Sequence, residues 1–220
     1  MPFNLREGDF DAIIFDCDGT LVDTAPTHFI AYREAFGSMG ISVNWDWYES
    51  LLGLTPESLL DRYESEFGLK IPCPRAELIE SYSHAFRRNV NQLREIPAVA
   101  KVARAWKRIV PLAVASNGER ENVLASLSAT RLLDLFSTVV TAEDVHHGKP
   151  APDLFLEAAN RLGVAAKRCL VFEDSDEGMA AARAAEMRSF DIRRFLTYGE
   201  SRILQLIDTV PIQEGGLQNW

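Results

Sequence analysis

Short apolar runs separated by amphipathic stretches dominate two parts of the chain. The runs are rich in Val, Ile, Leu, Phe and Ala and predict buried strands, while the stretches between them have helical spacing. The expected strands cover residues 11–16, 110–116, 136–142, 169–174 and 189–192, and the expected helices cover residues 97–108, 119–128, 152–163 and 176–187. Strands that alternate with helices of this length predict βαβ units and a parallel sheet.

The segment between the first strand and the others has a different pattern, with helical signals and no strand signal. Helices with Pro or Thr near their starts or Gly near their ends are expected over residues 25–40, 55–68 and 74–90. The predicted fold class is therefore α/β, with a Rossmann-like three-layer parallel-sheet core and an inserted all-helical domain. The core would comprise residues 1–23 and 94–220, and the insertion residues 24–93.

Composition narrows the possible partners. The formal net charge is -9 and no long Lys/Arg run occurs, which argues against nucleic acid, although a local pocket can still attract an anion. Three widely spaced cysteines argue against a disulfide framework or a structural zinc site. Charges interrupt every apolar stretch before it could span a membrane, and residues 1–11 lack a signal-peptide pattern. We therefore expect a cytoplasmic protein with no membrane partner.

Polar residues follow four of the expected strands. In chain order they are Asp16 with Asp18, Ser116 with Asn117, Lys149, and Glu173 with Asp174. The carboxyl ends of parallel strands share one edge of a sheet, where ligands bind in such folds. Asp16 and Asp18 are two positions apart, so both can face the same ligand.

These residues lie in motifs with a recognisable order. "DCDGTLVDT" at residues 16–24, a Ser after an apolar strand, "GKPAPD" at 148–153 and "EDSDEG" at 173–178 resemble the four motifs of the haloacid dehalogenase superfamily. The resemblance is to its phosphatase and sugar-phosphate mutase branch, whose helical cap follows the first motif, as the insertion does here. It implies a phosphoric monoester hydrolase, and the chain looks most like bacterial fructose-1-phosphate and 6-phosphogluconate phosphatases.

The resemblance also implies a role for each motif residue. Asp16 would be the nucleophile that forms an aspartyl-phosphate, and Asp18 the general acid and then the general base. Ser116, Asn117 and Lys149 would hold the phosphate oxygens.

Several anions would meet at this site, and they need a cation. Two unit charges about 4 Å apart repel by about 4 kcal/mol at an effective dielectric constant near 20. Oxygen ligands without His or Cys select a hard ion, so Mg²⁺ is expected. We assign it to the side chains of Asp16 and Asp174 and the main-chain carbonyl of Asp18, with Glu173 as a direct ligand or a neighbour.

The substrate would be read by the cap. His28 and Thr55 are the expected cap contacts, and a cap of this size suits a small phosphate ester better than a polymer. A β-phosphoglucomutase is the close alternative, although such mutases usually carry Ser-Arg where this chain has Thr55 and Pro56. A catalytically silent metabolite-binding member is a further alternative. We expect a monomer.

Overall fold

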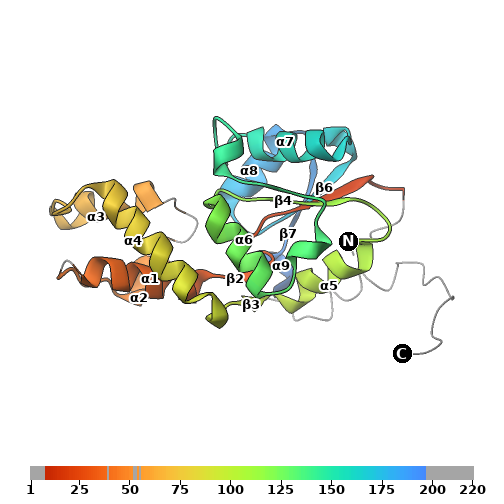
Figure 1. Ribbon diagram of the computed structural model, residues 1–220. Helices are drawn as coiled ribbons and strands as arrows, with labels where there is room; N and C mark the ends of the chain where they lie inside the picture. The colour runs from red at the N-terminus through yellow and green to blue at the C-terminus, as the bar shows by residue number, and fades with distance from the viewer. Residues whose placement is uncertain (1–7, 39, 52–53, 55, 197–220) are drawn as a thin grey trace, which may run out of the picture.

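The computed structural model describes residues 8–38, 40–51, 54 and 56–196 and contains a five-stranded parallel sheet (Figure 1). The strand order is β5-β4-β1-β6-β7, with β1 in the centre and every neighbouring pair parallel. The strands are β1 (Ala12–Phe15), β4 (Leu112–Ala115), β5 (Thr138–Val140), β6 (Cys169–Glu173) and β7 (Arg188–Asp191). All five coincide with strands that the sequence predicts.

Helices cover both faces of the sheet. One face packs against α5 (Pro97–Trp106) and α6 (Arg120–Ala129), and the other against α7 (Asp153–Leu162) and α8 (Asp176–Ala184). Alternate residues of β1 serve the two faces, because successive strand side chains point in opposite directions: Ile13 and Phe15 join the α5 cluster, and Ala12 and Ile14 the α7 cluster. The predicted three-layer core is confirmed.

The inserted helices lie to one side of the sheet (Figure 1). They are α1 (Ala25–Gly37), α2 (Trp45–Glu49), α3 (Pro56–Phe67) and α4 (Arg75–Arg88). Their shared core is aromatic, with the rings of Tyr32 on α1 and Tyr82 on α4 stacked at 4.2 Å between centroids. The sequence did not predict α2, whose single turn is too short for a periodic pattern. Its start is capped by the Asn44 side chain, which accepts from the Trp47 N–H.

A two-stranded antiparallel ribbon joins the inserted helices to the core. It pairs β2 (Val22–Asp23) with β3 (Arg94–Glu95), and neither strand is long enough to give a sequence signal. The predicted domain boundaries, at residues 23/24 and 93/94, stay a prediction. The ribbon lies next to both of them.

Short elements complete the described chain. Single 3₁₀ turns occur at Val90–Gln92, Leu133–Leu135, Ala142–Asp144 and Ala166–Arg168, and α9 spans Arg193–Leu196. No helix among the described residues is long and apolar enough to cross a membrane.

Candidate active site

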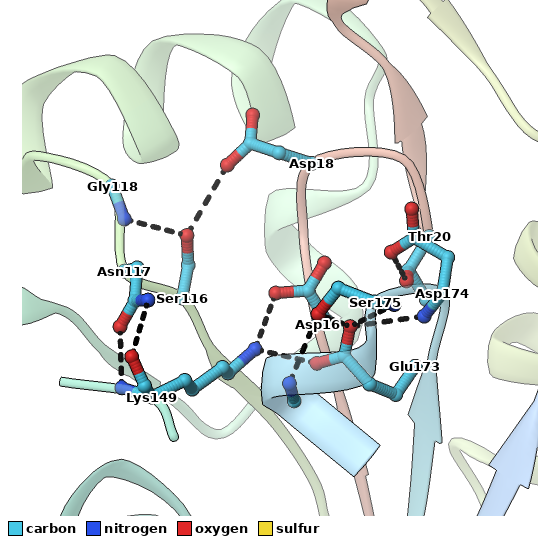
Figure 2. Close-up of polar contacts among 11 residues, drawn as sticks. Asp16, Asp18, Thr20, Ser116, Asn117, Gly118, Lys149, Glu173, Asp174 and Ser175 are labelled. Carbon is cyan, nitrogen blue, oxygen red and sulfur yellow. Dashed lines mark hydrogen bonds and ion pairs between the residues drawn. The ribbon is translucent and has the colours of Figure 1, made fainter. Parts of the chain in front are cut away.

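Lys149 joins two of the strand-end carboxylates. Its Nζ lies 2.5 Å from Asp16 Oδ1 and 2.7 Å from Glu173 Oε2, and all three side chains are buried (Figure 2). Burial opposes the ammonium charge, but the negative charges of Asp16 and Glu173 and their hydrogen bonds raise the pKa of Lys149 above its ordinary value. Lys149 therefore contributes a fixed positive charge at the end of the central strand.

Glu173 is surrounded by donors. Its Oε1 accepts from the Asp174 N–H and from the N–H and hydroxyl of Ser175, each at 2.9 Å, while Oε2 accepts from Lys149. A Cβ at Gly178 would lie 1.9 Å from Glu173 Oε2, so only glycine fits there. Glu173 thus has partners for both oxygens within the protein, and it fixes Lys149 in place.

A group of three carboxylates could accept a metal ion. One oxygen each of Asp16, Glu173 and Asp174 lies within 4.8 Å of the others. Burial, and then repulsion from Glu173, raises the pKa of Asp16, and burial is also the main reason that the pKa of Asp174 rises to about 6. These raised pKa values mean that the charged carboxylates are unfavourable side by side. A divalent cation bound between them would stabilise their charged forms.

The loop after β1 fits closely around Asp174. The Thr20 hydroxyl donates to Asp174 Oδ1 at 2.7 Å. Gly19 has a φ of +85°, and a Cβ there would lie 2.2 Å from Asp174 Oδ2. Glycine is therefore required at position 19 for two reasons: its backbone conformation and the close approach of the Asp174 carboxylate.

Asp18 faces a different set of partners. Its Oδ2 accepts from the Ser116 hydroxyl at 3.2 Å, and its Oδ1 lies 3.4 Å from His28 Nε2. Burial would raise the pKa of Asp18, but hydrogen bonds from His28, Thr24 and Ser116 together with the nearby imidazole lower it. Figure 2 shows Asp18 turned toward Ser116, while Asp16 is turned toward Lys149.

The second and third motifs are tied to each other. Asn117 Oδ1 accepts from the Lys149 N–H at 2.8 Å, and Asn117 Nδ2 donates to the Lys149 carbonyl at 3.3 Å. The Ser116 hydroxyl also accepts from the Gly118 N–H at 2.9 Å. The Asn117 side-chain amide therefore links two loops. Because both of its polar atoms are used in this link, the phosphate contact expected of Asn117 would be made by its main chain.

The two cap residues named from the sequence have different outcomes. His28 reaches Asp18 and also contacts Tyr82, whose hydroxyl lies 2.6 Å from His28 Nδ1. Thr55 lies outside the described residues. Tyr82 was not identified from the sequence, because it follows His28 by 54 positions and no motif spacing connects the two.

The chain has clear relatives among known proteins. Residues 13–192 match the family described as haloacid dehalogenase-like hydrolase. The fructose-1-phosphate phosphatase YqaB of Escherichia coli (strain K12) is 36% identical over 184 residues, which cover 84% of this chain and 97% of that protein.

Two solved structures agree with the fold. CbbY from Rhodobacter sphaeroides in complex with phosphate has a TM-score of 0.73 and 28% identity, and the match covers 82% of this chain and 84% of that one. A putative β-phosphoglucomutase from Thermotoga maritima has a TM-score of 0.70 and 28% identity, with 91% and 99% covered.

The motifs, the sheet and these relatives agree on one class. The chain belongs to the haloacid dehalogenase-like hydrolases. Within that family it is an enzyme of the phosphatase type, a phosphoric monoester hydrolase. The superfamily that the sequence motifs indicated is confirmed.

Proposed function

We propose that the protein is a Mg²⁺-dependent phosphatase of a small sugar phosphate and acts through an aspartyl-phosphate intermediate. The proposal rests on the different surroundings of two carboxylates, Asp16 and Asp18. Asp16 sits 2.5 Å from the Lys149 ammonium, while Asp18 is hydrogen-bonded to Ser116 and close to His28. One carboxylate thus lies beside a fixed cation, and the other has a separate set of partners suited to a proton carrier.

The two steps follow from this arrangement. Asp18 first takes up a proton, Asp16 attacks phosphorus, and the ester oxygen leaves with the proton that Asp18 donates to it. Asp18 then takes a proton from water, the water oxygen attacks the aspartyl-phosphate, and phosphate leaves with Asp16 regenerated. Proton transfer of this kind is worth about 10²–10⁴-fold in rate. Lys149, the Ser116 hydroxyl and the main chain at Asn117 would hold the phosphate oxygens.

The donor set at the carboxylates fits the expected metal. Asp16 and Asp174, with the main-chain carbonyl of Asp18, would hold Mg²⁺, and Glu173 would stay bonded to Lys149 and Ser175. When bound, the ion supplies the positive charge that lets the carboxylates and the phosphate dianion share one site.

The basic side chains of the cap have partners within the protein. Residues 24–93 contain six Lys and Arg side chains, and each has a partner among the described residues. The pairs are Arg62–Glu66, Lys70–Glu64, Arg75–Asp61, Arg87–Glu121 and Arg88–Glu34, and Arg33 lies over the ring of Phe29. Most of these pairs are exposed and contribute little, so they do not by themselves choose the substrate. Fructose 1-phosphate is the preferred candidate, ahead of 6-phosphogluconate, because the fructose-1-phosphate phosphatase YqaB is 36% identical to this chain.

A panel of phosphate esters tests the proposal. Fructose 1-phosphate, 6-phosphogluconate and β-glucose 1-phosphate are offered with Mg²⁺, with free phosphate and glucose 6-phosphate both measured. We expect phosphate release, greatest from fructose 1-phosphate, and loss of turnover on chelation that added Mg²⁺ restores. Glucose 6-phosphate formed without free phosphate would show the mutase alternative instead, and no turnover of any ester would favour a silent binding protein. A cytoplasmic location and a monomeric state stay predictions.

A further inference from the structure

Three side chains from three elements form a continuous polar chain next to the site. The Tyr82 hydroxyl on α4 lies 2.6 Å from Nδ1 of His28 on α1, and Nε2 of His28 lies 3.4 Å from Asp18 Oδ1 in the core. The imidazole is also stacked on the Phe86 ring, with centroids 4.3 Å apart and planes 17° from parallel. The ring of His28 is therefore held in plane by packing and at Nδ1 by a short hydrogen bond, while its contact with Asp18 at Nε2 is long.

The direction of these hydrogen bonds follows from the acceptor at one end. In the resting protein, before Asp18 takes up the proton that it donates, its carboxylate only accepts, so Nε2 of His28 carries the proton that points at Asp18. In the neutral ring Nδ1 then accepts, and the Tyr82 hydroxyl donates to it. Removal of that hydroxyl would leave Nδ1 of a half-buried ring without its donor and would free the ring to change its tautomer.

The next residue on α4 anchors the cap helix to the core. The Ser83 hydroxyl donates to Glu119 Oε2 at 2.6 Å, and Asn122 Nδ2 on α6 donates to the same carboxylate at 3.1 Å and to Ser83 at 3.3 Å. Arg87 adds a bond to Asn122 Oδ1 at 3.0 Å. Ser83 and Asn122 are both buried. We call these four residues the α4–α6 contact.

Adjacent residues of α4 thus contact His28 and the core. We propose that Tyr82 is a positioning residue that aligns Asp18 through His28, and that the α4–α6 contact makes this alignment depend on the seating of the cap. The inference rests on the proposed function, in which Asp18 protonates the leaving group. The His28–Asp18 distance of 3.4 Å is long for a hydrogen bond. A small movement of α4, passed to His28 through the Tyr82 hydroxyl, would therefore strengthen or break it.

The Tyr82→Phe variant tests the inference, because it removes the hydroxyl and keeps the ring. The rate at which Asp16 becomes phosphorylated is measured by rapid quench with two esters. A sugar phosphate needs a proton on its departing alkoxide, whereas p-nitrophenyl phosphate releases a stable anion. We expect the sugar phosphate rate to fall about 10-fold, part of the range of general acid catalysis, and the p-nitrophenyl phosphate rate to change by less than about 2-fold.

Ser83→Ala gives a second variant that leaves the polar chain itself intact. It should produce the same selective loss with the sugar phosphate, whereas Ser81→Ala, the same change two positions earlier on α4, should leave both rates unchanged. Equal losses with both esters in Tyr82→Phe, or no loss with either, would overturn the inference. If the unmodified protein releases phosphate from neither ester, the proposed function fails, and this inference fails with it.

Discussion

At the scale of single residues, a substitution of Asp16 gives the most direct test of the proposed mechanism. Burial and the nearby Glu173 raise the pKa of Asp16, and the Lys149 ammonium offsets only part of this effect, so ionising Asp16 costs free energy in the folded protein without metal. We predict that Asp16→Asn lowers kcat by about 10³-fold or more, because the amide cannot form the aspartyl-phosphate. The melting temperature without metal should be unchanged or higher, since a costly charge has gone and Lys149 keeps Glu173.

Steady-state kinetics and a thermal melt check the two halves of this prediction separately. Lys101→Gln, on the exposed side of α5, serves as a surface control that should alter neither quantity. Turnover within about 10-fold of the unmodified protein would refute Asp16 as the nucleophile.

At the scale of elements, the end of α8 carries a residue in an unfavourable conformation. The Met187 N–H bonds to the Ala182 carbonyl and the Glu186 N–H to that of Arg183, which is the Schellman pattern. It places Glu186 at a φ of +56°, where glycine is favoured. The ion pair of Glu186 with Lys167 offsets little, because both side chains are exposed.

Glu186→Gly should therefore stabilise the protein by about 0.5–1 kcal/mol, or about 1–4 °C in melting temperature. Ala184→Gly is the matched control: it places the same residue two positions earlier, at an exposed helical site, and should destabilise by a similar amount. Thermal and urea unfolding measure both variants. If Glu186→Gly and Ala184→Gly shift the stability in the same direction, the backbone explanation is wrong.

At the scale of the whole molecule, the proposed metal site joins the first strand to the fourth motif. Asp16 and Asp174 lie 158 positions apart in sequence yet share one cluster. A ligand that binds only the folded state stabilises it by about 1.4 kcal/mol at ten times its dissociation constant. We predict that saturating Mg²⁺ raises the melting temperature of chelator-treated protein by about 3–6 °C.

Asp174→Asn should abolish this shift, and Asp176→Asn, the same change at an exposed carboxylate nearby, should retain it. Differential scanning calorimetry with and without Mg²⁺ supplies a readout that does not depend on activity. An undiminished shift in Asp174→Asn would remove this residue from the metal site.

The sequence by itself determined the sheet, its covering helices and the order of the four motifs. Strand and helix periods are local, and the carboxyl ends of parallel strands must meet at one edge, so Asp16, Ser116, Lys149 and Asp174 could be brought together without coordinates. What the motifs left open was which partner each side chain faces.

Only the tertiary structure decided those pairings. It showed that both oxygens of Glu173 are already met by Lys149 and by donors of the next loop, and that His28 is held between Asp18 and Tyr82. These contacts join residues of separate elements, and their directions depend on how the cap helices pack against the core. No local pattern encodes that packing, because hydrophobic burial fixes which faces meet and leaves the polar contacts between them to side-chain geometry.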